Sequence, residues 1–177
     1  MTDNKSFTAR KIALGGILLA LTSLTLFAAA VSPTGKLSLY VLSSFYIAVV
    51  LMEFGIKAGW VFYPASCMLA FLALRGNVGG LFSYIAFFGI YGIVKFYAEK
   101  IKNPVVEYIF KAAYFNAVLV AAIFFARQVL SFDPIRLEIF PVWAVILASE
   151  VVFFLYDYVY SLFIQYYYQK IRKRIKL

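Results

Sequence analysis

Long apolar runs separated by short polar turns organise this chain from end to end. A helix that crosses the hydrocarbon core of a membrane needs about 20 mainly apolar residues. The pattern therefore predicts an all-α, polytopic membrane helical bundle with six transmembrane helices. The predicted spans are 12–31, 37–52, 58–74, 78–97, 108–125 and 140–163, followed by a basic tail at 164–177.

The polar turns between the runs carry helix-breaking residues, such as Pro33 and Gly35 in the first turn and Pro104 in the fourth. The second and third runs are the shortest, so we expect either to extend into its turn. No soluble segment separates the runs. We therefore expect one integral membrane domain over 1–177.

The first run allows two interpretations. Lys5, Arg10 and Lys11 precede it and small residues end it, as in a cleavable signal peptide. Its apolar core is long for a signal peptide, and more spans follow, which favours a retained helix. Cleavage would leave five spans in the same orientation.

Composition supports membrane insertion, because 64% of residues are hydrophobic and only 14% are charged. The net charge of +9 comes from basic residues clustered at span ends. Such clusters are typical of topology signals and of contacts to anionic lipid. We expect the lipid bilayer, and no nucleic acid, as a partner.

Lysine and arginine are distributed unequally between the two sides of the predicted bundle. With a cytoplasmic N-terminus, the inner set is Lys5, Arg10, Lys11, Lys57, Lys95, Lys100, Lys102, Lys111, Lys170, Arg172, Lys173, Arg174 and Lys176. The outer set is Lys36, Arg75, Arg127 and Arg136. Cytoplasmic loops carry the excess of basic residues. We therefore predict a multi-pass protein of the cell membrane with both termini cytoplasmic.

The residue inventory argues against enzymatic chemistry. Histidine is absent and Cys67 is the only cysteine. This excludes a disulfide within the chain, a zinc site built from His and Cys, and a Ser–His or Cys–His nucleophile pair. We expect no catalytic residue, metal or cofactor, and we expect Cys67 to be a packing residue.

Two carboxylates interrupt the last span. Glu150 and Asp157 are seven residues apart, so on a helix they share a face and are separated by about 10 Å along the axis. They could form a proton or cation relay or contact a polar ligand. Alternatively, they pair with neighbouring helices and fix the packing, with Lys111 as a partner for Asp157 and Asn116 for Glu150.

Polar and aromatic residues collect at the predicted outer ends of the spans. They are Lys36, Tyr40, Arg75, Asn77, Tyr84, Arg127, Gln128, Asp133, Arg136, Glu138 and Trp143. Around an outward-facing cavity, aromatic rings could stack on a solute and arginines could orient its carboxylate or phosphate. The candidate ligand-binding residues are Glu150, Trp143, Arg127, Arg75, Tyr40 and Tyr84. Helix capping and headgroup anchoring would explain the same residues without a solute.

Small residues recur along one face of the first helix. Ala9 and Ala13, and then Gly16 and Ala20, are four apart, and Ser23 continues the second pair. Small residues at this spacing let another helix approach closely. The stripe is either packed inside the chain or a docking face for another membrane subunit.

These features resemble the substrate-binding S components of energy-coupling factor vitamin transporters. Those proteins are compact, basic, six-helix membrane proteins of about this length, and many carry an alanine-x-x-x-alanine pattern on the first helix. Ala9 to Ala13 and the variant Gly16 to Ala20 stand in matching places. The first outer turn, 32–36, is shorter than the loop that often folds over the ligand in that family.

The resemblance implies a vitamin-sized ligand held near the outer face. It also implies a partner permease subunit that packs against the small-residue stripe and is associated with ATPases. We therefore expect a solute-binding membrane subunit of a transporter. The alternative is a cell-envelope scaffold or assembly factor without transport activity. A membrane enzyme and an ion-coupled carrier using Glu150 are further possibilities.

Overall fold

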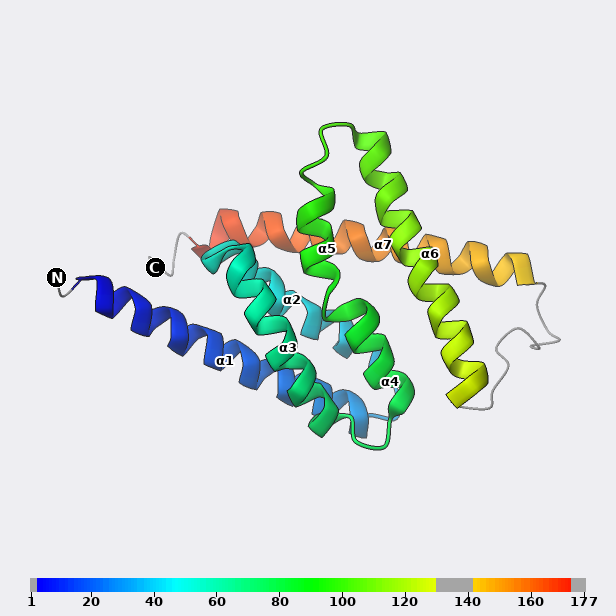
Figure 1. The fold of residues 1–177 in the computed structure, drawn as a ribbon, viewed down its shortest axis with the longest axis horizontal. Coiled ribbons are helices and arrows are strands. Elements are labelled where there is room, and N and C mark those ends of the chain that lie inside the picture. Colours follow the sequence, from blue (N-terminus) through cyan, green and yellow to red (C-terminus); the bar gives the residue numbers. More distant parts are fainter. Residues whose placement is uncertain (1–2, 130–141, 173–177) are drawn as a thin grey trace. The chain divides into compact units, whose positions relative to one another are not determined.

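A computed structural model describes the backbone of residues 3–129 and 142–172, with side chains from residue 11 to 129 and from 143 to 172 (Figure 1). All regular structure in these ranges is helical, which confirms the predicted all-α class. The α-helices are α1 (Asp3–Val31), α2 (Lys36–Phe54), α3 (Ile56–Ala73), α4 (Val78–Ser83), α5 (Tyr91–Ala98), α6 (Pro104–Val129) and α7 (Val142–Tyr166). Two segments are π-helical: η1 (Tyr84–Phe88) lies between α4 and α5, and η3 (Tyr167–Ile171) follows α7.

Within the described ranges, six helical segments are long and apolar enough to cross a membrane, as predicted. They are Lys11–Val31, Lys36–Phe54, Ile56–Ala73, Val78–Ala98, Pro104–Val129 and Trp143–Ile171. The second span extends into both flanking turns, as its short apolar run suggested. The expected start of the sixth span, at residue 140, lies outside the described residues. These six helices indicate a membrane protein.

The chain divides into two compact units, an N-terminal unit (Met1–Ala113) and a C-terminal unit (Tyr114–Leu177). The N-terminal unit holds the first four spans and the start of α6. The C-terminal unit holds the rest of α6, then α7 and η3. The expectation of a single membrane domain over 1–177 stays a prediction.

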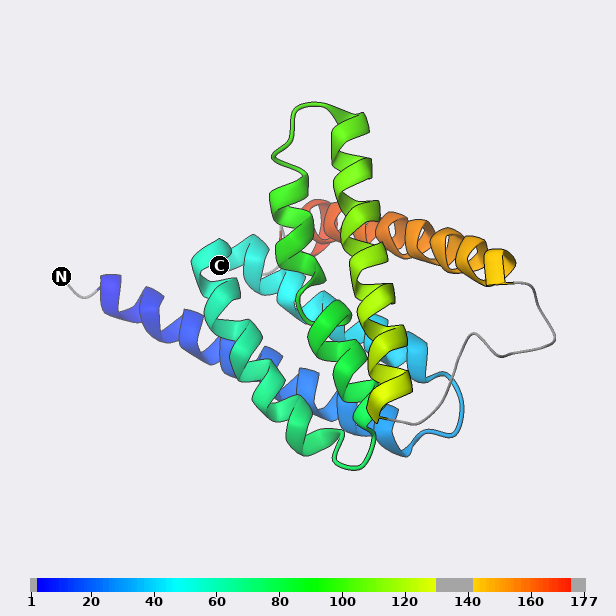
Figure 2. The same ribbon diagram turned by 45° about the vertical axis from the view of Figure 1, so that its right-hand side comes forward.

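Three long helices form the centre of the N-terminal unit. α1 packs against both α2 and α3, and α2 also contacts η1 and α5 (Figure 2). The buried core joins one residue of α1, three of α2 and one each of α3 and α5. These residues are Leu18, Ile47, Val50, Leu51, Phe62 and Ile93. Because large aliphatic and aromatic side chains from four helices meet here, this cluster fixes their mutual packing.

The packed face of α1 is defined by five buried residues at helical spacing. They are Leu18, Thr22, Thr25, Leu26 and Ala29. The two threonines are accommodated in this apolar face because their hydroxyls donate to carbonyls one turn earlier, at Leu18 (2.8 Å) and Leu21 (2.7 Å). The Thr25 hydroxyl also lies 3.2 Å from the Tyr46 hydroxyl of α2, so a polar contact crosses the α1–α2 interface.

Glycines make the sharp turns between the first helices. Gly35, Gly55 and Gly76 have φ values of 73°, 79° and 93°, in the left-handed region that residues with a Cβ avoid. The glycines therefore let α2, α3 and α4 each start after a short turn that reverses the chain. The successive spans of the N-terminal unit run antiparallel as a result (Figure 1).

The antiparallel order brings alternate helix ends to the same side of the N-terminal unit. At one end, the Lys11 ammonium lies 5.8 Å from the centre of the Phe54 ring, and the Trp60 indole donates to the Tyr97 hydroxyl at 3.4 Å. We call this the basic end, because it holds Lys11, Lys57, Lys95, Lys100 and Lys102. The opposite end holds Lys36 and Arg75 among the described residues.

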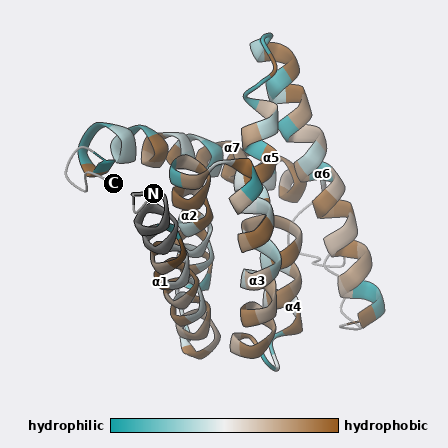
Figure 3. Ribbon diagram, turned by 60° about the vertical axis from the view of Figure 1, so that its left-hand side comes forward, coloured by the Kyte–Doolittle hydropathy of each residue, from teal (hydrophilic) through white to brown (hydrophobic). Residues whose placement is uncertain are grey.

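The helices of the N-terminal unit are mainly hydrophobic, and polar residues lie in its turns. Hydrophobic residues cover most of α1, α2, α3 and α4, and hydrophilic residues mark the turn between α3 and α4 (Figure 3). Many large apolar side chains on the outer surface are exposed, including Ile17, Met68 and Phe71. An exposed apolar surface on this scale fits a lipid environment.

Candidate functional site

The fourth span is interrupted near its middle. It begins as α4, passes into the π-helix η1, loses regular structure at Gly89–Ile90 and resumes as α5, a break visible in Figure 2. In η1 the Gly89 N–H donates to the Tyr84 carbonyl at 2.7 Å, one residue further back than in an α-helix. A regular helix would have used the Ile85 carbonyl. That carbonyl instead accepts a hydrogen bond from the Tyr63 hydroxyl of α3 at 2.9 Å.

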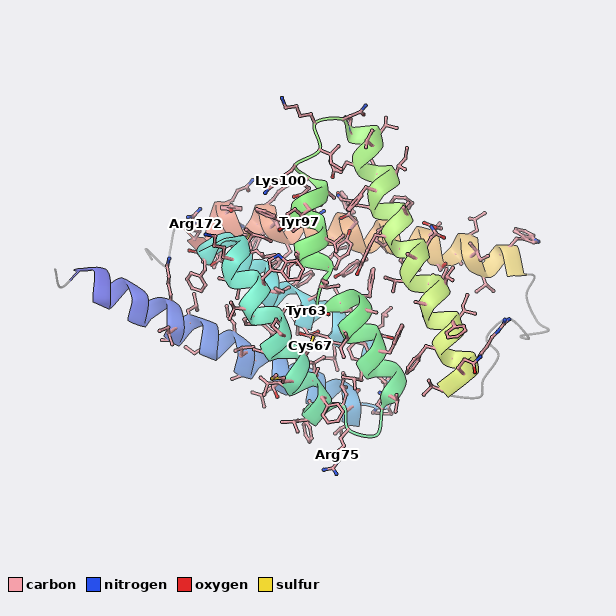
Figure 4. All side chains as sticks on the ribbon, viewed as in Figure 1. Tyr63, Cys67, Arg75, Tyr97, Lys100 and Arg172 are labelled. Carbon is pink, nitrogen blue, oxygen red and sulfur yellow. The ribbon has the colours of Figure 1, made fainter. Side chains whose placement is uncertain are left out.

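Close packing around Tyr84 explains why a glycine stands at the break. A Cβ at position 89 would lie 3.0 Å from the Tyr84 carbonyl oxygen and 3.1 Å from its ring. The Tyr84 side chain is buried and lies within reach of Ser66 and Cys67 on α3. Cys67 therefore belongs to the packed surroundings of the break. Tyr63 and Cys67 both lie along the middle of α3 (Figure 4).

Buried hydroxyl groups lie on α2 and α3, the two helices that pack against η1 and α5. Ser43 and Ser44 of α2 and Ser66 of α3 are buried, and each donates to a carbonyl three residues earlier at 2.6–2.7 Å. Aromatic rings fill the rest of the region, with Tyr91 fully buried behind the break. The chemistry offered here is therefore stacking and neutral hydrogen bonding.

Tyr40 connects the start of α2 to the start of α4. Its hydroxyl accepts from the Asn77 amide at 3.5 Å, and its ring stacks on Phe88 with centroids 5.6 Å apart. Asn77 also caps α4, because its side-chain oxygen accepts from the Gly80 N–H at 2.9 Å. A Cβ at Gly80 would collide with the Tyr40 hydroxyl. The glycine therefore allows α2 and α4 to approach closely at this point.

Of the six candidate ligand-binding residues, three lie in the N-terminal unit. Tyr40 and Tyr84 are buried around the interrupted span, whereas Arg75 is exposed in the turn after α3, at the far end from Tyr97 (Figure 4). The structure therefore associates the two tyrosines through the α2–η1 contact and leaves Arg75 at the surface.

The other three candidates belong to the C-terminal unit. Arg127 is exposed in the last turn of α6, and Trp143 is exposed at the start of α7. Glu150 lies two turns further along α7, and its carboxylate accepts from the Asn116 amide of α6 at 2.5 Å. The Asn116–Glu150 pairing suggested by the sequence is therefore present. Phe115 and Phe153 stack beside it with centroids 4.5 Å apart.

Asp157 lies on the buried stripe of α7, with 6% of its surface exposed. Lys111, its suggested partner, is buried in the N-terminal unit and forms an ion pair with Glu107 at 2.6 Å, one turn earlier on α6. The Lys111–Asp157 pairing stays a prediction. Three further outer-face candidates, Asp133, Arg136 and Glu138, lie outside the described residues.

The small-residue stripe lies on the side of α1 opposite its packed face. Ala13, Gly16 and Ala20 are all exposed, about half a helical turn away from Leu18 and Thr25. A Cβ at Gly16 would meet no atom within 4 Å. Ala9 falls in the same register of the continuous helix. Packing within the N-terminal unit therefore does not use Ala13, Gly16 or Ala20.

Comparison of the chain with protein-family models, curated proteins and solved structures finds no match. In the described part of the chain, no group of three or more Cys, Asp and Glu residues could hold a metal ion.

Sequence reasoning missed the break in the fourth span and the contacts that maintain it. Tyr63 and Ser66 carry no pattern that marks them, since hydroxyl residues are common in membrane helices. The fourth span does carry a visible signal in its four glycines, Gly79, Gly80, Gly89 and Gly92, which permit close helix packing. Glycine density within one span also favours a local loss of helical regularity.

Proposed function

We propose that this protein is the solute-binding membrane subunit of a transporter, similar to the S components of energy-coupling factor transporters. The observation that carries the solute-binding part is the interrupted fourth span. Broken transmembrane helices occur where the backbone is buried in protein or lines a cavity, and transporters place binding sites at such breaks near the bilayer midplane. Here the break lies among Tyr40, Tyr63 and Tyr84.

The chemistry around the break favours a particular class of solute. The surrounding groups in the N-terminal unit are hydroxyls and aromatic rings rather than charges. They suit a small, flat and uncharged part of a vitamin-like molecule, which can stack on rings and exchange hydrogen bonds with hydroxyls. In this proposal the opposite end of the unit faces outward and both termini are cytoplasmic, which agrees with the excess of lysine at the basic end.

The exposed small-residue stripe on α1 supports the proposed binding of a permease subunit. Large apolar residues suit contact with lipid, whereas small residues are enriched where helices touch. Ala13, Gly16 and Ala20 leave a shallow strip of backbone open over about two turns. A helix of a permease subunit would pack there, and that subunit would bring the ATPases. The proposal assigns no catalytic step to this chain.

The solute is tested by purifying the protein in mild detergent and analysing extracted small molecules by mass spectrometry. We expect a bound compound in the wild-type protein and its loss in Tyr84→Leu, with Ile17→Leu on the lipid-facing side of α1 as the matched control. Candidate compounds should raise the melting temperature of the wild type and of Ile17→Leu, but not that of Tyr84→Leu. An empty protein that no such compound stabilises would contradict solute binding.

The docking face is tested with Gly16→Leu combined with Ala20→Leu. Neither site is packed against the rest of the unit, so we expect normal expression and melting temperature but loss of copurifying permease and ATPase subunits. Ala28→Leu adds the same bulk at an exposed position of α1 off the stripe and should leave copurification intact. A complex that survives the double substitution would place the interface elsewhere.

A scaffold or assembly factor is the second candidate, and one observation favours it. Tyr40 and Tyr84 are engaged in packing and hydrogen bonds within the unit, as structural residues would be. Under this alternative, the stripe on α1 docks an envelope protein and no solute copurifies. Mass spectrometry of the protein partners recovered with the wild type, and lost with the stripe variant, separates the two candidates.

A further inference from the structure

The basic end of the N-terminal unit carries an ordered pair of aromatic side chains at its surface. Trp60, in the second turn of α3, donates its indole N–H to the hydroxyl of Tyr97, in the last turn of α5, at 3.4 Å. The two side chains are 48% and 44% exposed. Tryptophan and tyrosine concentrate at the headgroup level of membranes, where an apolar ring and a polar atom are both solvated.

Two lysines lie on the solvent side of this aromatic pair. Lys57 precedes Trp60 by one turn of α3, and Lys100 follows Tyr97 by three residues, just beyond the end of α5. Both lysines are exposed. Because α3 and α5 run antiparallel and meet through Trp60 and Tyr97, both lysines lie beyond the pair in the same direction. Tyr97 and Lys100 are seen together at this end of α5 in Figure 4.

The aromatic rings also position one of these cations. The Lys100 ammonium lies 4.4 Å from the centre of the Phe96 ring and 5.3 Å from that of Tyr97. A cation over the face of an aromatic ring is attracted by the ring quadrupole. The Lys100 ammonium is therefore held next to the aromatic pair, and it keeps N–H donors for an anion.

Nearby carboxylates do not cancel this charge. The Glu99 carboxylate forms an ion pair with the buried ammonium of Lys95, one turn earlier, with 3.1 Å between the charged atoms. Glu53, at the end of α2, is one carboxylate against the exposed ammonium groups of Lys57 and Lys100. Lys102 adds a further exposed cation in the turn before α6. The surface beside Trp60 and Tyr97 is therefore positively charged.

We propose that Lys57, Trp60, Tyr97 and Lys100 form a binding site for the phosphate-bearing headgroup of an anionic phospholipid. The two ammonium groups contact the phosphate, and the aromatic pair lies against the glycerol and upper acyl region. This assignment is independent of the proposed transport function. The proposed site is one defined place on the lipid-facing surface. The excess of lysine and arginine, in contrast, describes a whole side of the protein.

Tryptophan fluorescence tests the site directly, because the chain has two tryptophans. In a Trp143→Phe background, Trp60 is the only tryptophan, and excitation at the long-wavelength edge of tryptophan absorption avoids the tyrosines. The protein is reconstituted in bilayers that contain brominated phosphatidylglycerol or brominated phosphatidylcholine at equal mole fraction. We expect phosphatidylglycerol to quench Trp60 preferentially, with a relative association constant raised by about five-fold for each lysine. Trp143 alone, in a Trp60→Phe background, should show a smaller preference.

Variants that remove charge test which lysines cause the preference for phosphatidylglycerol. Lys57→Gln with Lys100→Gln should abolish the preference at Trp60, and Lys57→Arg with Lys100→Arg should retain it. Lys36→Gln with Arg75→Gln, at the opposite end of the unit, is the matched control and should change nothing. Equal quenching by both lipids, or a preference that persists in the glutamine variant, would overturn the proposal.

Inorganic phosphate distinguishes the two sources of a phosphate ligand. At matched ionic strength, phosphate and chloride should reduce the lipid preference equally, because both only screen charge. If phosphate abolishes the preference and chloride does not, the site binds a soluble phosphate compound and the lipid assignment is wrong.

Discussion

At the scale of single residues, the most informative contact is that between Asn116 and Glu150 in the C-terminal unit. Carboxylates inside membrane spans are rare and are usually paired. Glu150 is paired with the amide that the sequence suggested, at 2.5 Å, and the pair joins α6 to α7. A structural role is therefore present whether or not Glu150 also contacts a solute.

Substitutions at Glu150 separate these roles. Glu150→Gln keeps an acceptor for Asn116, so we expect a melting temperature close to that of the wild type. Glu150→Leu removes the acceptor and should destabilise the protein by about 0.6–2 kcal/mol, the range for hydrogen bonds between membrane helices. The measurement is thermal unfolding in detergent. Normal stability with impaired solute binding in Glu150→Gln would assign a functional role; no stability loss in Glu150→Leu would remove the structural one.

At the scale of elements, the fourth span differs from the others because its backbone hydrogen bonds are rearranged. The shift from Ile85 to Tyr84 as the acceptor for Gly89 frees a carbonyl that Tyr63 satisfies from another helix. Free backbone groups in a membrane cost several kcal/mol, so such a break requires a partner of this kind. The break is therefore stabilised by tertiary contacts and not by local sequence alone.

Alanine substitution of two glycines tests this interpretation. Gly89→Ala should destabilise the protein by about 1–3 kcal/mol, since its Cβ would press on the Tyr84 backbone and ring. Gly16→Ala is the matched control, since its Cβ meets nothing within 4 Å, and its better helix propensity should be neutral or stabilising by up to about 1 kcal/mol. Thermal unfolding of both variants is the measurement. Equal stability of the two variants would show that Tyr84 can move to accommodate a Cβ at position 89 without cost, which would contradict this interpretation.

At the scale of the whole molecule, the distribution of charge relates the N-terminal unit to the membrane. Its antiparallel helices place five lysines at the basic end, against Lys36 and Arg75 at the opposite end of the described unit. From the positive-inside rule we predict that the basic end faces the cytoplasm. Aromatic side chains beneath cations recur at the end of α7, where Lys170 lies 5.4 Å from the Tyr166 ring and Arg172 lies 5.3 Å from that of Tyr168.

Orientation is tested with single cysteines, because replacing Cys67 by serine leaves a chain without thiols. We expect Lys36→Cys and Arg75→Cys to react with a membrane-impermeant maleimide in intact cells. Lys57→Cys and Lys102→Cys should react only after the membrane is permeabilised. Labelling is measured by the mass shift of the purified protein. The reverse pattern would invert the topology, and with it the side from which a solute enters.

The sequence by itself determined the helical class, the six spans and their approximate limits, because a run of about 20 apolar residues is sufficient to specify a membrane helix. It also offered Asn116 as a partner for Glu150 under one of two interpretations, since charged groups in membrane spans usually pair. It left open which face of α1 is packed. Two faces of α1 are compatible with helix contact: the face with Leu18 and Leu26, and the small-residue stripe with Gly16. Only the positions of α2 and α3 decide which of the two is packed. The break in the fourth span was likewise decided by tertiary structure, because the hydroxyl that satisfies Ile85 comes from a different helix.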